Sequence, residues 1–127
     1  MTGPTVMTDI DLPSLDDIRA AAVRIEGHVH HTPVMSSALL SRHCGVDVVF
    51  KCENLQKVGA FKARGACNAV FSLSDEQAVR GVATHSSGNH GAALAMAAGL
   101  RGIPAYIVMP TSAPAGKKAA VAGYGAV

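Results

Sequence analysis

The spacing of apolar residues in the first part of the chain predicts two helices and a strand. Four apolar residues recur at helical spacing in the first of these segments: Leu15, Ile18, Ala22 and Ile25. Ser14, with Asp17 three residues later, resembles a capping box, so we expect a helix over residues 15–26. A short helix closed by Gly45 should follow, and then a buried strand over residues 46–52.

The rest of the chain alternates regularly between helical and strand patterns. The pattern predicts a helix over residues 61–73, a strand over 82–84, a helix over 92–98 ended by Gly99, a strand over 105–109 and a helix over 114–122. Strands separated by helices of this length imply parallel pairing and right-handed crossovers. We therefore expect an α/β fold, with an open three-layer parallel sheet and helices on both faces.

Two loops are expected at the functional edge of that sheet. In open α/β sheets, ligands bind outside the carboxyl ends of the strands. The loop 59–62 follows the predicted strand 46–52, and the loop 86–90 follows the predicted strand 82–84. Both loops open a helix, so both are candidates for a binding site.

Composition and charge narrow the class of partner. Hydrophobic residues make up 49% of the 127 residues and charged residues 16%, which is typical of one folded domain. The net charge is only +2 and the basic residues are scattered, so neither a nucleic acid nor a membrane surface is expected as a partner. No apolar run has the length of a membrane span. We expect a cytoplasmic protein that binds a small molecule.

Cysteines and histidines show no disulfide or metal pattern. The cysteines are odd in number and lack C-x-x-C spacing, which indicates reduced thiols: Cys44, Cys52 and Cys67. Three histidines cluster in a predicted loop: His28, His30 and His31. No cysteine or carboxylate stands at ligand spacing from them, so we expect no metal site.

Lys62 stands in the stretch KVGAFKAR and is the first candidate for chemistry. We expect it one turn inside a helix, buried between that helix and the sheet. A helix N-terminus and burial both disfavour an ammonium, and a neutral lysine is a nucleophile toward aldehydes. Such a lysine suits a Schiff base with pyridoxal phosphate. The alternative is a surface lysine in the first turn of a helix.

The stretch SSGNH, residues 86–90, is the second candidate. Its hydroxyls and the free backbone N–H groups at the start of a helix converge on a spot suited to an anion such as a carboxylate. Simple capping of the helix is the alternative. The nucleotide-binding patterns G-x-G-x-x-G and G-x-x-x-x-G-K-[ST] are absent from the chain.

Two stretches carry a close resemblance to a known family. They are KCENLQKVGAFKARGA, residues 51–66, and THSSGNHG, residues 84–91. With TPV at 32–34 and IPAYIVMP at 103–110, they resemble the serine racemase and serine/threonine dehydratase family of fold type II pyridoxal phosphate enzymes. The resemblance runs from about residue 15 to residue 127. It implies that the chain is the small-domain half of such an enzyme.

The resemblance implies a role for each site residue. Lys62 would bind pyridoxal phosphate covalently and move the α-proton on one face of the cofactor, with Phe61 packed beside the ring and Asn89 bonded to the phenolic oxygen. The substrate carboxylate would be held by four further positions: Ser86, Ser87, Gly88 and His90.

Ser87 is the residue that separates branches of the family. It would stand opposite Lys62 as a second acid/base, which reversal of configuration at the α-carbon requires. Biosynthetic threonine dehydratases generally have alanine there, so the serine favours the racemase-like branch, whose members also eliminate water from serine. Ala60 stands where relatives commonly have serine. The implied reaction is deamination of L-serine or L-threonine to an oxoacid and ammonia, with serine racemisation beside it.

The resemblance also divides the chain and names further partners. We expect a disordered tail over residues 1–13, a segment over 14–52 that packs on an absent large domain, and a truncated small domain over 53–127. The phosphate cradle would lie beyond this sequence, and we expect the complete protein to be a homo-oligomer, a dimer. ATP is kept as a candidate effector because three residues match part of its pattern in racemases: Ser36, Ser37 and Lys57. The alternative is an inactive α/β module that does not retain the cofactor.

Overall fold

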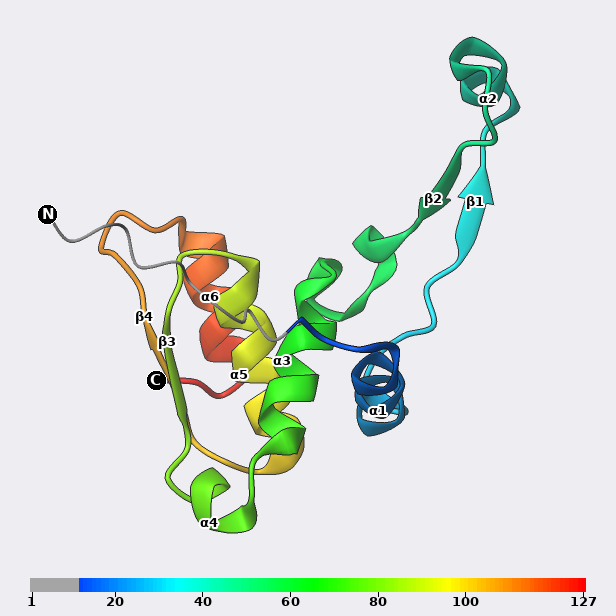
Figure 1. Ribbon diagram of the computed structural model, residues 1–127. Coiled ribbons are helices and arrows are strands. Elements are labelled where there is room, and N and C mark those ends of the chain that lie inside the picture. Colours follow the sequence, from blue (N-terminus) through cyan, green and yellow to red (C-terminus); the bar gives the residue numbers. More distant parts are fainter. Residues whose placement is uncertain (1–11) are drawn as a thin grey trace, which may run out of the picture.

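A computed structural model describes residues 12–127 of the chain (Figure 1). Most of the tail expected over residues 1–13 lies outside the described residues. The elements follow in the order α1 (Leu15–Ile25), β1 (Val34–Ser36), α2 (Ala38–Cys44), β2 (Val49–Lys51), η1 (Glu53–Leu55), η2 (Lys57–Gly59), α3 (Lys62–Ser72), α4 (Asp75–Ala78), β3 (Val82–His85), α5 (Asn89–Arg101), β4 (Ala105–Val108) and α6 (Ala115–Gly123).

The parallel sheet is formed by β3 and β4. Val82 pairs with Ala105 and His85 with Val108, so the two strands are in register over their full length. The last residue, Val127, is hydrogen-bonded to β4 on the edge away from β3, through N–H···O distances of 2.7 and 3.0 Å. The predicted α/β class with a parallel sheet is confirmed.

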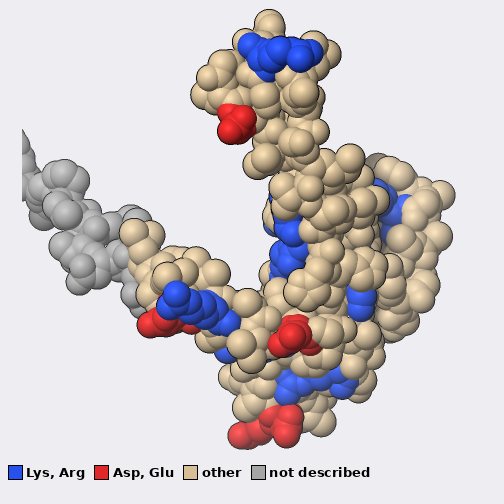
Figure 2. Space-filling model, turned by 90° about the vertical axis from the view of Figure 1, so that its right-hand side faces the viewer, with Lys and Arg blue, Asp and Glu red and all other residues tan. Residues whose placement is uncertain are grey.

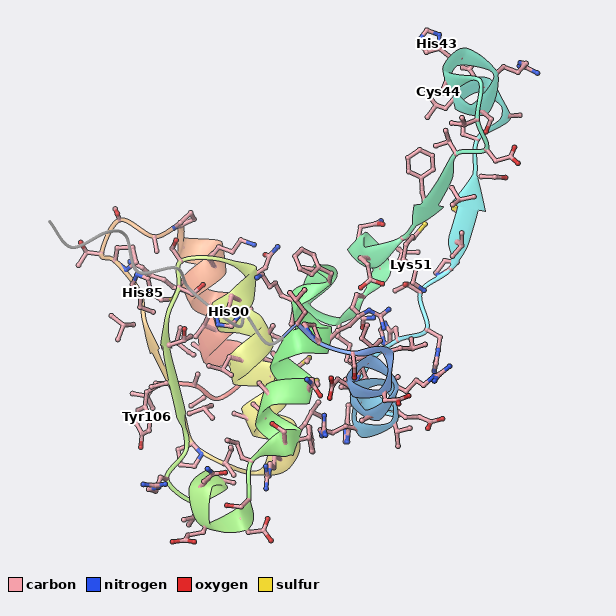
Figure 3. All side chains as sticks on the ribbon, in the orientation of Figure 1. His43, Cys44, Lys51, His85, His90 and Tyr106 are labelled. Atoms are coloured by element: carbon pink, nitrogen blue, oxygen red, sulfur yellow. The ribbon has the colours of Figure 1, made fainter. Side chains whose placement is uncertain are left out.

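Helices α3, α5 and α6 lie on one side of this sheet (Figure 1). Within β4, Ala105 and Ile107 are buried while Tyr106 and Val108 are exposed, and Tyr106 points away from the helices (Figure 3). The three-layer arrangement with helices on both faces is therefore not present among residues 12–127. The alternation of β4 is that of a strand with one buried face and one open face.

The core lies between α5 and α3. Every residue of α5 from 91 to 98 is buried, and most of them are alanine or glycine, so α3 can approach closely through Ala63, Ala66 and Cys67. The helix predicted to end at Gly99 continues to Arg101, and Gly102 closes it in the left-handed conformation with φ 72°. A Cβ at Gly99 would lie 3.3 Å from a backbone oxygen of Tyr124, so this glycine serves packing rather than helix termination.

Strands β1 and β2 with α2 form a projecting arm (Figure 1). The prediction that residues 46–52 form a buried strand of the parallel sheet is wrong. β2 pairs antiparallel with β1, Val34 opposite Lys51, and the exposed fractions of Val49 and Phe50 are 64% and 45%. The reason is local: the backbone N–H of Cys52 donates to the Pro33 carbonyl, and this antiparallel partner is available without a crossover.

Side-chain caps mark the starts of α1, α2 and α4. Ser14 and Asp17 form the expected capping box of α1, and Ser37 accepts from the Leu40 N–H at the start of α2. A second capping box, Ser74 with Gln77, starts α4. All three cysteines are free thiols, as expected.

The molecular surface and helix lengths give two further observations. On the face shown in Figure 2, basic and acidic side chains form small separate groups over the arm and the body. None of the helices described over residues 12–127 combines the length and hydropathy of a membrane span.

Candidate active site

Lys62 is the first residue of α3, directly after the two 3-10 turns η1 and η2. Its Nζ lies 5.3 Å from the centroid of the Phe61 ring, so the two neighbouring candidates are in contact. Lys62 was predicted to be buried and to lie one turn inside the helix. Both parts of this prediction are wrong, because Lys62 begins α3 and its side chain is exposed. Since β2 pairs with β1 instead, no strand of the parallel sheet lies among residues 12–61 to bury Lys62.

An ion pair holds the turns before Lys62 against α3. Arg64 donates two hydrogen bonds to the Glu53 carboxylate, Nε to Oε2 at 2.8 Å and Nη2 to Oε1 at 2.7 Å. Thr32, which is buried, donates its hydroxyl to Oε1 at 2.5 Å. Hydrogen bonding to Arg64 lowers the pKa of Glu53 from 4.5 to about 2, although burial acts in the opposite direction.

Gln56 is a second buried anchor in the same loop. Its Oε1 accepts from the backbone N–H groups of His30 at 2.8 Å and Lys57 at 2.9 Å, and its Nε2 donates to the His30 carbonyl at 2.8 Å. Next to it, Val58 has φ 57°, a left-handed conformation that β-branched residues rarely adopt. The loop before Lys62 is thus held in one strained shape by buried polar contacts.

Ser86 caps the start of α5. Its Oγ accepts from the backbone N–H groups of Gly88 at 3.3 Å and Gly91 at 3.1 Å, while its own N–H donates to the Val108 carbonyl at 3.0 Å. A Cβ at Gly91 would lie 3.0 Å from the Ile107 side chain, which explains the glycine. For Ser86, the structure shows the capping arrangement that the sequence left open.

A cleft of about 610 Å³ lies beside this cap. Its lining comes from the loop after β3 and from the end of β4: His85, Ser86, Ser87, Gly88, Val108, Met109 and Pro110. Ser87 is exposed in the cleft, whereas His90 borders a separate recess of about 310 Å³. Figure 3 shows His85 at the end of β3, on the side away from the helices, and His90 at the start of α5.

The two candidate stretches are brought to the same end of the molecule. Helices α3 and α5 pack along one another and begin at the same end (Figure 1), and η2 contacts α5. Lys62 and Asn89 are the first residues of these helices. Lys62, Phe61, Asn89 and His90 do not line the cleft that Ser87 lines, so the structure gathers two adjoining groups rather than one pocket.

The proposed ATP-contacting residues are spread over the chain. Ser37 caps α2 at the far end of the arm, whereas Lys57 lies in η2 beside the start of α3 (Figure 1). No contact in the structure joins them, and ATP as an effector stays a prediction. The division into segments 14–52 and 53–127 also stays a prediction.

The comparison with known proteins decides the family. The family described as "Pyridoxal-phosphate dependent enzyme" matches residues 25–127. The chain belongs to this family. It is 51% identical over 113 residues to a serine racemase of Dictyostelium discoideum, covering 89% of this chain and 35% of that protein.

Two further relatives agree with that result. The chain is 53% identical over 116 residues to a β-hydroxyaspartate dehydratase of Paracoccus denitrificans, covering 91% of this chain and 37% of that protein. The structure of maize serine racemase superposes with a TM-score of 0.84 at 57% identity, covering 88% of this chain and 34% of that one. The fold is that of fold type II enzymes, and the chain spans about a third of the length of these relatives.

The residues of the site fit pyridoxal phosphate, the cofactor of this family. An exposed lysine amine stands beside an aromatic ring, and Asn89 Nδ2 has no hydrogen-bond partner among residues 12–127. Over the same residues, the backbone N–H groups of Asn89 and His90 at the start of α5 are also without partners. These groups are donors of the kind that an anionic ligand needs.

Sequence reasoning missed the residues that shape the site. Glu53, Gln56 and Lys117 were assigned no role, yet the first two fix the loop before Lys62 and the third donates to Asn89. Glu53 and Arg64 are 11 residues apart across two turns, so no helical or strand periodicity relates them. The only sequence feature that relates Glu53 to Arg64 is that both lie inside the KCENLQKVGAFKARGA stretch.

Proposed function

We propose that this chain belongs to an enzyme that deaminates L-serine or L-threonine to an oxoacid and ammonia, and that also racemises serine. The observation that carries the proposal is the joint placement of Lys62 and the loop 86–90 at the starts of two packed helices. Support comes from relatives named serine racemase and β-hydroxyaspartate dehydratase, each about half identical to this chain.

Each residue has a separate task in this proposal. Bound pyridoxal phosphate withdraws electrons from the α-carbon of the amino acid, which lowers the barrier to loss of the α-proton. Lys62 holds the cofactor and moves the α-proton on one face of it. Phe61 packs beside the cofactor ring. Asn89 donates to the phenolic oxygen. Loss of the β-hydroxyl as water, followed by hydrolysis, leaves the oxoacid and ammonia.

The loop before α5 binds the substrate and supplies the second proton carrier. Ser86, Gly88 and His90 hold the substrate carboxylate together with the backbone N–H groups of Asn89 and His90, which have no partner among residues 12–127. Ser87 acts on the face opposite Lys62, where it gives or takes the α-proton. Its exposed position in the cleft suits a group that must reach substrate, whereas Ser86 is engaged in capping.

The proposed function is tested by measuring the turnover of L-serine and L-threonine by a chimera. Residues 12–127 are joined to the part of the Dictyostelium serine racemase that the match does not cover, and release of oxoacid from L-serine and L-threonine is measured. In Ser87→Ala, racemisation should fall about 100-fold or more while elimination from L-serine changes much less. Ser112→Ala, an exposed serine of the loop before α6, should leave both rates unchanged. Equal loss of both activities in Ser87→Ala contradicts the assigned role.

A further inference from the structure

Lys117 of α6 contacts the asparagine of the candidate site. Its Nζ donates a hydrogen bond of 2.7 Å to Asn89 Oδ1, across 28 residues of sequence. Helix α6 packs against α5, and buried Val121 fixes it on the core. The adjacent Lys118 instead donates to the Thr111 carbonyl at 2.6 Å. Two neighbouring lysines of the same helix therefore have different partners, and Lys117 is the one directed to α5.

This hydrogen bond decides which end of the Asn89 amide stays available. An asparagine amide offers an oxygen that accepts and an NH2 group that donates, whereas an ammonium can only donate. Lys117 therefore binds Oδ1 and leaves Nδ2 for another partner, and the structure gives Nδ2 none over residues 12–127. The positive charge of the ammonium also polarises the amide, which strengthens its N–H groups as donors.

We propose that Lys117 is a positioning residue that holds Asn89 as a hydrogen-bond donor toward the phenolic oxygen of bound pyridoxal phosphate. This inference rests on the proposed function, in which Asn89 binds that oxygen. A flipped amide would place Oδ1 against the phenolic oxygen, and two acceptors repel one another. Helix α6 thereby becomes part of the site, although Lys117 does not touch the reacting atoms.

The effect of Lys117 is measured as a change in the affinity of the chain for pyridoxal phosphate. Lys117→Met keeps an unbranched side chain that is one atom shorter but removes the donor, and it should weaken pyridoxal phosphate binding about tenfold. Lys118→Met is the matched control, because it removes the same charge one residue away, and it should change affinity by less than about twofold. Lys117→Arg retains a cationic donor and should restore most of the affinity. Equal loss in Lys117→Met and Lys118→Met overturns the proposal.

A double-variant cycle separates positioning from a direct effect of charge. If Lys117 acts through Asn89, Lys117→Met has no further effect on affinity in a chain that already carries Asn89→Ala. If the two losses add, Lys117 acts on the cofactor or on folding without Asn89, and the proposal is wrong.

NMR of the chain without cofactor distinguishes failure of this inference from failure of the proposed function. Asn89 is one of three asparagines, so Asn89→Ala identifies its side-chain amide signals. These signals should shift in Lys117→Met and stay in place in Lys118→Met. Unshifted signals in Lys117→Met overturn the inference even where the cofactor binds. Shifted signals in a chain that takes up no cofactor support the Lys117 contact and count against the proposed function alone.

Discussion

Replacement of Glu53 by glutamine tests whether the Glu53–Arg64 pair stabilises the loop before Lys62. The side chains of Arg64 and Glu53 are 32% and 19% exposed, so the pair is partly shielded from water. The change keeps the shape of residue 53 but removes its charge and one acceptor site for Arg64. It therefore isolates the ion pair from the packing of the loop.

The magnitude follows from the pKa of Glu53, which the pair lowers from 4.5 to about 2. Taken in full, a shift of this size corresponds to about 3 kcal/mol of folding stability. Partial solvent access reduces it, and we expect Glu53→Gln to cost about 1–2 kcal/mol at neutral pH. Because the folded chain has the lower pKa, the contribution is full above about pH 4.5 and is lost as pH falls toward 2.

Urea denaturation of the chain, followed by circular dichroism, gives the free energy of unfolding at each pH. The difference between wild type and Glu53→Gln should be largest near pH 7 and should shrink as the pH falls through the acid range. Asp16→Asn is the matched control, because the Asp16–Arg19 pair is 88% and 69% exposed and should contribute within about 0.5 kcal/mol. An equal cost for the two variants, or a Glu53 difference that is independent of pH, would refute the reasoning.

The remaining predictions compare two glycines and the two serines before α5. Gly81→Ala should cost more than about 2 kcal/mol, since φ is +78° and a Cβ would lie 2.6 Å from the Pro104 oxygen; Gly116→Ala, where a Cβ meets nothing within 4 Å, should stabilise the chain by about 0.5–1 kcal/mol. Denaturation curves of the two variants check both signs. Ser86→Ala should cost about 1 kcal/mol as a lost cap, whereas Ser87→Ala should change stability by less than about 0.5 kcal/mol, and equal costs would contradict the separate roles.

Features that depend on neighbouring residues were predictable from the sequence. The capping box of Ser14 and Asp17 and the left-handed Gly45 mark the start of α1 and the end of α2, because each cap is formed within one turn of its helix. The apolar pattern predicted the start of α3 to within one residue, whereas α5 begins at Asn89, three residues before the predicted start at 92. The candidate site residues Lys62 and Asn89 are the first residues of these two helices, so the place of the candidate site in the fold was predictable to within a few residues.

Features that depend on distant partners were not predictable. The Val46–Cys52 run has the composition of a buried strand. Its residues in β2 nevertheless pair antiparallel with β1, so the run lies in the arm. The exposure of Lys62 follows from that pairing and not from its own sequence. The Lys117 contact with Asn89 depends on how α6 crosses α5, which periodicity does not specify.

The central claim is that Lys62 is the residue that binds pyridoxal phosphate covalently. The most direct measurement is borohydride reduction of the chimera loaded with the cofactor, followed by peptide mass spectrometry. The chain has five lysines, so the result is a distribution among Lys51, Lys57, Lys62, Lys117 and Lys118. We expect one labelled site in residues 12–127, at Lys62, and no label on any of these lysines in Lys62→Ala. Label at another of the five, or spread evenly over them, would contradict it.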